Sequence, residues 1–474
     1  MKVVNPRTGE ADYEIAPLDA DAVAAEAQRL RQAQPDWAAK TSQERGDIMR
    51  QWADAIEAAL PQIIPALTDD TGRGGISRIE AGGVPDQIRR WAERAPKLID
   101  AGQPTGQPTS HQTITTSTQL VPYQLVGVIS PWNFPMTLAL IDAVPALMAG
   151  CAVLIKPSEV TPRFMKPLME TVRAIPELAK VLSFIEGDGA TGAAMVGNSD
   201  YICFTGSVAT GRKVGEAAAA AFIPASLELG GKDPMIILSD ADPDKAAAIA
   251  LRASIVNTGQ ACQSIERVYV ARSIADDFLA ALKEKAEAVQ LNYPDIKQGH
   301  IGPFIFGKQA ELTQSQIDQA VSKGAEILTG GKVENLGGGQ YLRPTVLTKV
   351  TADMDIIREE NFGPVIPVTI YDDVEEAIAQ ANASKFGLSA AVISASVEQA
   401  EKVAGKLNVG AVSINDGSLT GMVWEAEKSS FGYSGLGASR MGESGLLRFF
   451  RSRVLMRQTG EAAQIASFAE ENFA

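Results

Sequence analysis

From about residue 120 onward, short apolar runs alternate with amphipathic stretches along the chain. The apolar runs are rich in Val, Ile, Leu and Phe and predict strands; in order they are "LVGVIS", "CAVLIKPS", "VLSFIEG", "YICFTGS", "ASLELGG" and "PMIILSD". Apolar strands separated by helical stretches are typical of a parallel sheet with helices on both faces. Ligands of such sheets bind beyond the carboxyl ends of the strands, so we expect functional residues there.

A second alternating set begins after Asp240. A helix is predicted to start with Asp242 as its N-cap and Pro243 at its first position, and to run to Asn257, with Gly259 just past its end. The elements that follow are "ERVYVA", a helix at 275–290, "GAEILTGG", "YLRPTVLTKV", "GPVIPVTIYD", a helix at 373–384, "LSAAVIS" and "VGAVSIN". This set predicts a second α/β domain, and no internal repeat is evident.

Residues 18–101, before the first sheet, read as mostly helical. The segment that follows, "GQPTGQPTSHQTITTSTQL", is polar, and two interpretations stay open: a flexible linker or an extended arm. The β-branched part "TITTSTQLV" favours the arm. Residues 136–155 carry one charge over 20 positions, yet Pro145 and Gly150 predict a buried helix followed by a strand rather than a membrane span.

Composition narrows the class of protein. A chain of 474 residues is long enough for two or more packed domains. The net charge of −14, with no basic run, argues against nucleic acid or an anionic membrane as a partner. Three cysteines without a Cys-x-x-Cys pair indicate a reducing compartment, expected to be the cytoplasm, and neither a disulfide framework nor a metal site. The N-terminus lacks the apolar core of a signal peptide.

Two glycine loops follow predicted strands. Residues 187–192 match G-x-G-x-x-G, but no acidic residue stands about 20 positions later to hold a ribose, which argues against the standard dinucleotide fingerprint. Residues 206–211 open a helix whose backbone amides could receive a pyrophosphate. Because Arg212 and Lys213 follow this loop instead of Lys-Ser or Lys-Thr, it is not a Walker A loop.

Cys262 is predicted to lie in a loop without a histidine partner. His111 and His300 are isolated from any Ser or Cys motif, so a Ser-His-Asp or Cys-His mechanism has little support. Judged alone, Cys262 is better interpreted as an inert thiol, since an active one needs its thiolate favoured by dipoles, a cation or a cofactor. Lys156 and Glu159 end another strand and could hold ribose hydroxyls or form a solvated pair.

Seven motifs together resemble the NAD(P)-dependent aldehyde dehydrogenase superfamily, in its order and over nearly the whole chain. They are "SPWNFP" (130–135), "IKPSE" (155–159), "FTGSVATGR" (204–212), "LELGGKDP" (227–234), "NTGQACQ" (257–263), "EENFGPV" (359–365) and "FGYSGLG" (431–437). The resemblance implies an aldehyde-dehydrogenase-like α/β fold with three parts. These are a Rossmann-type NAD-binding domain (1–105 and 123–230), an α/β catalytic domain (231–440), and a small β oligomerisation arm with the C-terminal tail (106–122 and 441–474).

The resemblance also implies catalytic roles for three residues. Cys262 would be the nucleophile, and the Asn133 side chain with the Cys262 amide would stabilise the oxyanion. Glu228 would be the general base that activates water, giving the carboxylic acid through a thiohemiacetal and a thioester. Relatives that pass the acyl group to CoA usually lack this glutamate; such an enzyme is one alternative, and a catalytically idle binding protein on the same fold is another.

The resemblance implies NAD as the cofactor. Glu159 favours NAD because a carboxylate repels the 2′-phosphate of NADP, which stays an alternative. The cofactor-binding residues implied are Trp132, Lys156, Glu159, Gly189, Ser207, Leu229, Glu360 and Phe362.

The substrate implied is a small apolar aldehyde, aromatic or medium-chain. Phe134, Leu138, Trp424 and Phe431 would line its tunnel, although Leu138 could equally be a core residue. The segments 415–430 and 430–435 depart from the common family pattern, which weakens the assignment of the substrate. The strand "RSRVLMRQ" and the arm imply a homodimer or a dimer of dimers. The tail beyond it reads as a frayed helix or as a cover for a neighbour's site.

Overall fold

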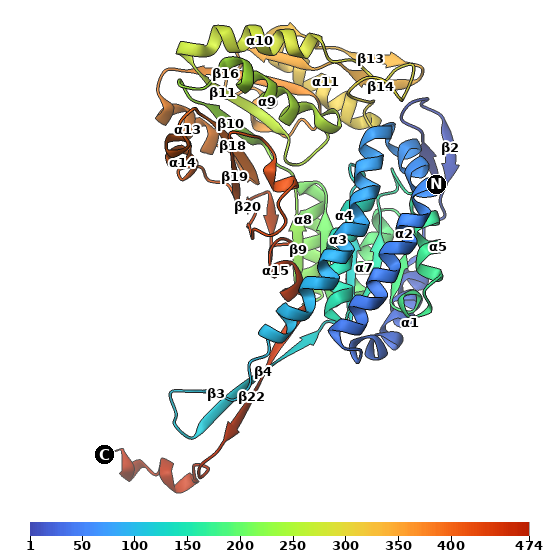
Figure 1. Cartoon of the computed structure of the whole chain (residues 1–474), viewed down its shortest axis with the longest axis vertical. Helices are drawn as coiled ribbons and strands as arrows, with labels where there is room; N and C mark the ends of the chain where they lie inside the picture. Colours follow the sequence, from blue (N-terminus) through green and yellow to red (C-terminus); the bar gives the residue numbers. More distant parts are fainter. Residues whose placement is uncertain (474) are drawn as a thin grey trace.

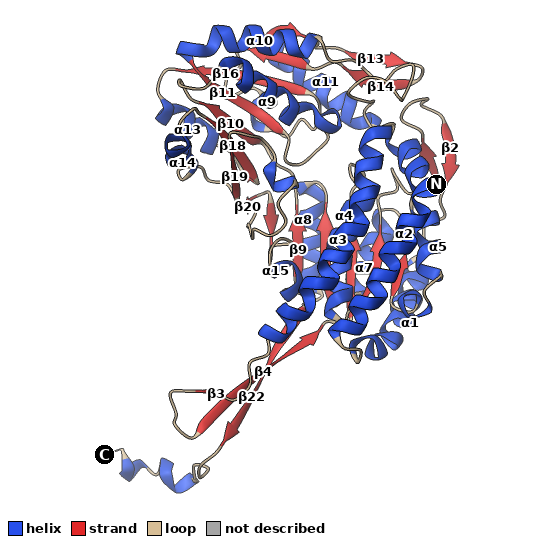
Figure 2. Ribbon diagram, viewed as in Figure 1, coloured by secondary structure: helices blue, strands red, loops and turns tan. Residues whose placement is uncertain are grey.

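Two α/β bodies and a projecting arm make up the chain (Figure 1). The computed structural model describes residues 1–473. Figure 2 shows two separate groups of strands, each flanked by helices, and a long two-stranded ribbon that leads away from them to the C-terminus. No strand is shared between the two large sheets, so each body has its own sheet and core.

A short hairpin and three long helices form the N-terminal region, which confirms the helical prediction for residues 18–101. The elements are β1 (Lys2–Val4), β2 (Ala11–Glu14), α1 (Ala20–Ala38), α2 (Ser42–Thr71) and α3 (Gly74–Ala101). A capping box between Thr41 and Glu44 starts α2, and Gly72 ends it with φ of 68°. The chain therefore reverses at Gly72, and α3 packs against α2.

The first large sheet has the Rossmann strand order, which confirms that part of the prediction. Its five parallel strands are β5 (Leu125–Ile129), β6 (Ala152–Lys156), β7 (Leu182–Phe184), β8 (Tyr201–Thr205) and β9 (Ala225–Glu228). Numbered along the chain, they lie side by side as 3-2-1-4-5, with the switch point between β5 and β8. The short strand β21 (Gly435–Leu436) adds to β9 in antiparallel fashion, so the chain returns to this sheet before it enters the arm.

Helices cover both faces of the first sheet. They are α4 (Pro135–Ala149), α5 (Met165–Arg173), α6 (Pro176–Ala179), α7 (Gly189–Asn198) and α8 (Val208–Ala220). Helix α4 packs on β5 and β6 beneath α2 and α3, whereas α1 and α7 contact the same strands and each other. Nearly every residue of α4 is buried, as the sequence predicts. Within residues 1–473, no helix has the length and hydrophobicity needed to span a membrane.

The second sheet is parallel except at one edge. In spatial order its strands are β12 (Glu326–Thr329), β15 (Thr345–Thr348), β16 (Val365–Tyr371), β11 (Ile265–Ala271), β10 (Asp233–Ile237), β18 (Ser389–Ile393) and β19 (Ala411–Ile414). Only β12 runs antiparallel to its neighbour. The predicted strands of the second α/β set are thereby confirmed. Two small pairs accompany the sheet: β13 (Val333–Leu336) with β14 (Gly339–Leu342), and β17 (Phe386–Gly387) with β20 (Phe431–Gly432).

The helices of the second body follow the predicted order, with one correction. They are α9 (Pro243–Ile255), α10 (Ala275–Glu287), α11 (Gly307–Ser322), α12 (Asp355–Arg358), α13 (Val374–Asn382) and α14 (Val397–Ala404). The Asp242 side chain caps α9, as predicted. The helix ends at Ile255 rather than Asn257, because Asn257 and Thr258 have φ of 61° and 60° within the 3₁₀ turn η1 (Val256–Gly259).

The polar segment after α3 is an arm rather than a flexible linker. Strand β4 (Ile114–Pro122) pairs with β22 (Phe450–Gln458) along its whole length, and β3 (Gln107–Pro108) pairs with β4. The chain reaches β22 through the short helix α15 (Ser444–Leu447). The remaining short turns are η2 (Arg272–Ile274), η3 (Leu419–Gly421), η4 (Ile465–Phe468) and η5 (Glu470–Asn472).

The two large sheets meet edge to edge. Asn133, Ser207 and Leu229 follow the carboxyl ends of β5, β8 and β9, whereas Cys262 and Glu360 precede the amino ends of β11 and β16. All five residues line one cavity. Because neighbouring strands are parallel, each sheet presents a single kind of strand end at this junction, and loops far apart in the sequence converge there.

Candidate active site

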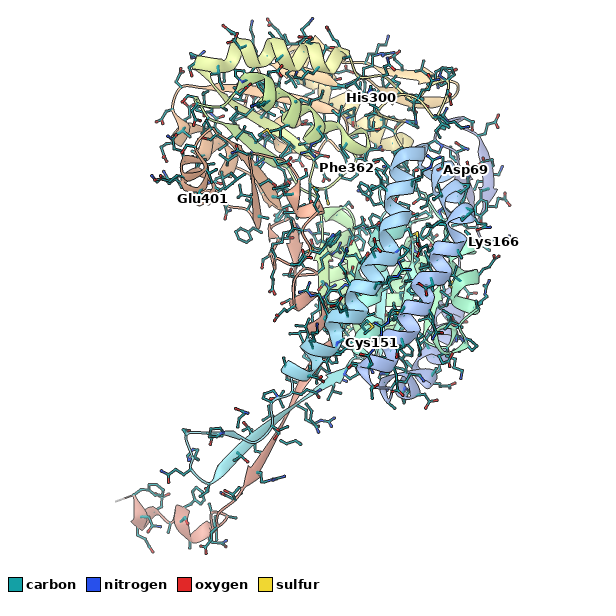
Figure 3. All side chains as sticks on the ribbon, in the orientation of Figure 1. Asp69, Cys151, Lys166, His300, Phe362 and Glu401 are labelled. Atoms are coloured by element: carbon teal, nitrogen blue, oxygen red, sulfur yellow. The ribbon has the colours of Figure 1, made fainter. Side chains whose placement is uncertain are left out.

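The cavity at the junction of the two sheets has a volume of about 130 Å³. It brings together nine of the residues singled out from the sequence, namely Trp132, Asn133, Leu138, Ser207, Glu228, Leu229, Cys262, Glu360 and Phe362. Figure 3 shows Phe362 at the boundary between the two bodies. Sequence reasoning did not single out the remaining lining residues, which are Pro131, Thr205, Gly206, Gly230 and Gln309.

A run of left-handed backbone positions Cys262. Asn257, Thr258 and Gly259 have φ of 61°, 60° and 71°, and this conformation is unfavourable for a β-branched residue such as Thr258. Two contacts hold it: the Thr258 hydroxyl donates to the Gly302 carbonyl at 3.1 Å, and the Asn257 amide donates to the Gln260 carbonyl at 2.9 Å. The chain is thus turned at the end of α9, and Cys262 lies in the loop before β11.

Two glycines allow the loops to approach this closely. A Cβ at Gly259 would lie 2.2 Å from the Gly363 carbonyl oxygen, and a Cβ at Gly231 would lie 2.4 Å from the Cys262 carbonyl oxygen. Both distances are far shorter than any van der Waals contact, so a larger residue would push the loops apart. The glycines of "NTGQACQ" and "LELGGKDP" therefore serve packing rather than chain flexibility.

Cys262 is the one partly exposed cysteine of the three; Cys151 and Cys203 are buried. Burial raises the pKa of the Cys262 thiol to about 12, and the nearby Glu360 carboxylate raises it further. Neither histidine lines the cavity. Without a cofactor, the thiol form of Cys262 is therefore the stable one at neutral pH.

Asn133 is bound to the Cys262 loop through both its side chain and its backbone. Its side-chain amide donates to the Gln260 carbonyl at 3.0 Å. Its own carbonyl accepts from the Asn257 amide at 3.2 Å and from the Arg73 guanidinium at 3.0 Å. The amide predicted to stabilise an oxyanion is thus held at the loop that carries the thiol. Arg73 lies 60 positions away in the chain, and no motif marks it.

Glu228 ends β9 and is held by residues from the C-terminal part of the chain. The Ser430 hydroxyl donates to one carboxylate oxygen of Glu228 at 3.1 Å. The Arg440 Nε lies 3.9 Å from the other oxygen, and the same guanidinium donates to Asp142 at 3.2 Å. Ser430 begins the motif that departs from the family pattern, so this departure bears directly on the Glu228 carboxylate.

Glu360 is fixed by a buried network that sequence reasoning missed. Its carboxylate accepts from the Gly231 amide at 3.0 Å. Burial, with the neighbouring Glu266 charge, raises the pKa of Glu360 to about 8. Glu266 in turn accepts from the Lys232 ammonium at 2.7 Å and from the Phe362 amide at 3.0 Å. The buried Lys232–Glu266 pair therefore anchors the loop that carries Glu360. The only available signal was Lys232, which lies within "LELGGKDP".

Three predicted cofactor residues lie at the edge of the first sheet, outside the lining of the cavity. Lys156 ends β6; its ammonium donates to the Pro157 and Gly187 carbonyls at 3.0 Å each and lies 3.3 Å from the Glu159 carboxylate. Burial lowers the pKa of Lys156. Gly189 begins α7, and a Cβ there would meet nothing within 4 Å, so this position leaves open space.

The donors and acceptors along this edge fit a dinucleotide. Ser207 caps α8 by accepting from the Thr210 amide at 3.3 Å, and the free amides of a helix N-terminus suit phosphate groups. The Glu159 and Glu360 carboxylates can accept hydrogen bonds from ribose hydroxyls. The Trp132 and Phe362 rings meet edge to face at 5.4 Å in the cavity between them.

Only Leu138 of the four predicted substrate residues borders this cavity. Phe134 lies under the Arg73 guanidinium, whose carbon is 5.6 Å from the ring centre. Phe431 belongs to β20, which pairs with β17, and is 39% exposed. Trp424 lines a second, smaller cavity that α3 and α4 also border. The structure therefore gathers the predicted catalytic residues but separates the predicted substrate residues.

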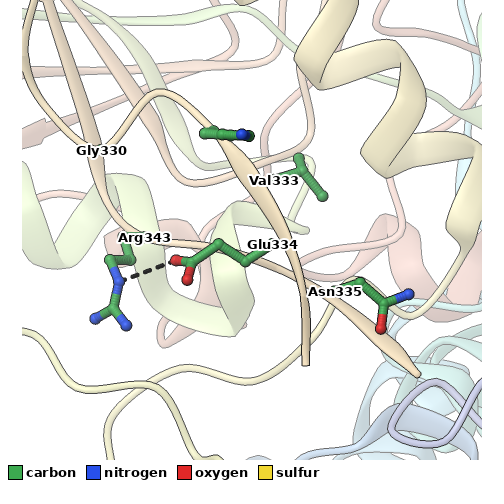
Figure 4. A pocket seen from close by; sticks show the side chains of 6 residues that line it. Gly330, Val333, Glu334, Asn335 and Arg343 are labelled. Carbon is green, nitrogen blue, oxygen red and sulfur yellow. Dashed lines mark hydrogen bonds and ion pairs between the residues drawn. The ribbon is translucent and has the colours of Figure 1, made fainter. Parts of the chain in front are cut away.

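Another hollow, on the β13–β14 hairpin, has no residue in common with the Cys262 cavity (Figure 4). Gly330, Lys332 and Val333 border it, and Glu334 forms an ion pair with Arg343 at 3.0 Å across it. Because its charges satisfy each other, the hollow offers no set of groups aimed at a ligand.

A Rossmann-type sheet whose carboxyl edge faces a loop cysteine is the architecture of a nicotinamide-dependent oxidoreductase. The family model described as "Aldehyde dehydrogenase family" matches residues 1–455. The chain belongs to the aldehyde dehydrogenase family.

Individual relatives agree with this assignment. A Mycolicibacterium smegmatis protein provisionally named succinate-semialdehyde dehydrogenase, with NADP as the stated cofactor, is 35% identical over 92% of this chain and 84% of its own length. A solved aldehyde dehydrogenase from Anabaena variabilis, provisionally named PutA, is 48% identical with a TM-score of 0.96, covering 98% of both chains. The NAD complex of Staphylococcus aureus betaine aldehyde dehydrogenase is 29% identical with a TM-score of 0.90, covering 98% of this chain and 92% of that one.

These findings confirm the fold, the enzyme class and the kind of cofactor expected from the sequence. The protein is an oxidoreductase that oxidises aldehydes with a nicotinamide dinucleotide.

The raised pKa of Cys262 predicts how its reactivity depends on pH. In the cofactor-free protein, the rate of alkylation by iodoacetamide should rise about tenfold per pH unit from about pH 7 to pH 10, because the thiolate fraction rises by that factor below the pKa. Mass spectrometry of the peptide containing Cys262 measures the rate, and Cys262→Ala gives the background. A rate that levels off below about pH 9 would show that the thiol is not held protonated.

Proposed function

We propose that the protein oxidises an apolar aldehyde to the carboxylic acid with NAD, through a thioester on Cys262. The observation that carries the proposal is the meeting of three groups in one cavity: the Cys262 thiol, the Asn133 amide and the Glu228 carboxylate. A nucleophile, an oxyanion donor and a base are the groups that acyl chemistry requires. A structural cysteine would need none of the other two.

The first step is addition of the Cys262 sulfur to the aldehyde carbon. The S–C bond forms as the carbonyl oxygen takes up negative charge, and the Asn133 side-chain amide and the Cys262 backbone N–H stabilise that oxygen. Asn133 is buried and held by Gln260 and Arg73, so its amide needs little reorganisation as charge develops. Preorganised donors of this kind are among the largest contributions to enzymatic rate.

The residues that would hold NAD lie along the junction. Lys156 and Glu159 suit the adenosine ribose and Ser207 the pyrophosphate, while Glu360 suits the nicotinamide ribose; Trp132, Gly189, Leu229 and Phe362 complete the binding surface. When bound, NAD supplies the acceptor for the hydride and a positive charge that favours the Cys262 thiolate. The Glu159 side chain is 36% exposed beside Lys156, and its negative charge at this position favours NAD over NADP.

Release of the acid requires water and a base. Glu228 lines the cavity and is oriented by Ser430; its carboxylate can take a proton from water as the oxygen attacks the thioester and the C–S bond breaks. Glu360 is a poorer base for this step, because its raised pKa of about 8 leaves it mostly protonated at neutral pH before the cofactor binds. Glu228 thereby favours hydrolysis over transfer of the acyl group to CoA.

Apolar side chains around the thiol support an aromatic or medium-chain aldehyde as the substrate. Leu138 projects from α4 and borders the cavity together with Leu229 and Phe362. Such walls stabilise an apolar chain or ring by removing it from water.

A screen for NADH formation tests the function. Aromatic, aliphatic and carboxylated aldehydes are each supplied with NAD or NADP, and absorbance of the reduced cofactor is followed with and without CoA. We expect NADH, a free acid as the product and no dependence on CoA, whereas Cys262→Ala should lose activity by at least about 1000-fold. Full activity in Cys262→Ala, or no reduced cofactor with any aldehyde, would refute the proposed mechanism.

Glu228→Gln separates the two halves of the reaction. If Glu228 activates water, the variant should still release a burst of NADH equal to the number of active sites and then turn over about 100-fold more slowly or less. Rapid mixing with absorbance detection measures both phases. Loss of the burst itself would assign Glu228 to the first half of the reaction instead.

The arm supports a homodimer or a dimer of dimers. Strand β22 exposes apolar side chains, with Val454, Leu455 and Met456 exposed by 46%, 48% and 75%. The tail exposes Ile465 and Phe468 by 87% and 63%. Apolar groups gathered on a projecting strand are typical of a surface that another subunit covers.

Light scattering after gel filtration tests this assembly. The mass should be a multiple of 50.2 kDa, and the double variant Val454→Asp/Met456→Asp should lower it, because two charges would replace apolar groups on one face of β22. Ile79→Asp, which changes a residue that is 73% exposed outside the arm, is the control and should leave the mass unchanged. A monomeric wild-type protein at micromolar concentration would exclude the assembly.

A further inference from the structure

A second cavity lies between α3, α4 and the segment 415–430, and its walls are rich in arginine and tryptophan. It is lined by Gln87, Arg90, Trp91, Arg94, Ile141, Trp424 and Arg440. Its volume is about 20 Å³, whereas a single water needs about 10–15 Å³. A group the size of a carboxylate therefore fits, but a ring does not. We call this cavity the arginine subsite.

The arginine subsite is a neighbour of the Cys262 cavity. Leu138 borders the Cys262 cavity and Ile141 borders the arginine subsite. These two residues are three positions apart on α4, so they share a face of the helix and lie about 4.5 Å apart along its axis.

Arg440 also joins the two cavities. It lines the arginine subsite, donates a hydrogen bond to Thr205 in the wall of the Cys262 cavity, and places its Nε 3.9 Å from the Glu228 carboxylate. A substrate whose aldehyde group meets Cys262 can therefore direct its other end toward the arginine subsite.

The charges in the arginine subsite are not balanced by acidic side chains. Within residues 1–473, neither Arg90 nor Arg94 has a carboxylate within 4.0 Å, whereas the adjacent Arg89 pairs with Asp54 and Glu57 at 2.7 and 2.5 Å. Arg90 and Arg94 are four positions apart on one helix face, where like charges repel. An unbalanced pair is unexpected in a chain of net charge −14, unless an anion is bound between them.

Arg440 adds an independent observation. It is only 9% exposed, and its buried Nε–H has no hydrogen-bond partner. A buried guanidinium with an unsatisfied donor favours an acceptor from outside the chain, because an unmet donor is costly in the protein interior.

The subsite suits an anion better than a cation. Two tryptophans could form an aromatic box for a quaternary ammonium group, but the Arg94 guanidinium carbon already lies 5.9 Å from the centre of the Trp91 ring. A cationic ligand would meet three guanidinium groups. A carboxylate instead matches the planar, forked donors of arginine and can form two parallel hydrogen bonds with one of them.

We propose that the arginine subsite binds a carboxylate at the far end of the substrate, so that the preferred substrates are aldehydes with a terminal carboxylate (ω-oxo acids). The proposal rests on the proposed function and deepens it. The apolar middle of the substrate passes Leu138, and the negative end reaches Arg90 and Arg94. Trp91 and Trp424 narrow the space around that end, so a slender chain fits better than a branched one.

Paired substrates of equal length test the proposal. The wild-type enzyme should oxidise 6-oxohexanoate with a kcat/KM about tenfold or more above that for hexanal, and betaine aldehyde should be a poor substrate. The double variant Arg90→Gln/Arg94→Gln should lose that preference, mainly through a higher KM for 6-oxohexanoate, while kcat/KM for hexanal stays unchanged. Arg94→Glu should weaken 6-oxohexanoate further and improve betaine aldehyde.

Matched controls separate a local effect from a general one. Arg89→Gln removes a charge from the same helix outside the subsite and should leave the preference intact. Arg90→Lys/Arg94→Lys should retain part of it, since the charge remains without the forked geometry. Unfolding temperatures of all variants check that the fold is kept.

A binding measurement makes the test independent of turnover. Hexanedioate, the dicarboxylate product, should raise the unfolding temperature of the wild-type protein but not that of the double glutamine variant. Equal kcat/KM for hexanal and 6-oxohexanoate in the wild type, or an unchanged preference in the double variant, would overturn the subsite while leaving the proposed function standing. If no aldehyde is oxidised, the proposed function fails, and hexanedioate binding still decides whether the subsite exists.

Discussion

The hydrogen bonds of Asn133 hold the two sheets of this protein in register, and the rest of the site depends on them. Its side-chain amide and its carbonyl are both bound to the loop of residues 257–260, which belongs to the other body. Because all of these groups are buried, breaking one contact would leave an unsatisfied polar atom at a cost of about 1–3 kcal/mol. The same contacts set the distance between the oxyanion donor and the thiol, so packing and chemistry are controlled by one set of atoms.

Buried charge has a second structural role around the site. Lys232 and Glu266 form an ion pair in the interior, and Asp142 binds both Arg440 and Arg448. Removing one partner of such a group costs about 3–5 kcal/mol, since the remaining charge is left without compensation. These pairs hold the Glu360 loop and the segment next to Glu228, which explains how loops without regular structure can present functional side chains accurately. The same burial raises the pKa of Cys262 and of Glu360, so their charge states depend on what is bound beside them.

Much of the fold could be predicted from the sequence, because its signals are local. The apolar runs that become β5, β6 and β8 are buried on both faces, and burial of this kind requires a continuous apolar pattern. The end of α9 was missed by two residues, since the left-handed turn at Asn257 and Thr258 depends on contacts with Gly302 and Gln260 rather than on their own preferences. The substrate residues were least accessible to sequence reasoning: Trp424 and Leu138 border different cavities, and no local pattern records which wall a side chain reaches.

The sequence by itself determined the alternation of strands and helices, the arm and the family, and it marked Cys262, Glu228 and Asn133 by motifs of a few residues each. Only the tertiary structure decided which charges meet. Arg440 lies beside Glu228, and Arg90 and Arg94 face the cavity next to the thiol, although these residues belong to segments far apart in the chain. Short motifs persist in sequence because they act through their own backbone, whereas an electrostatic environment is a sum over neighbours that come together only when the sheets and helices pack.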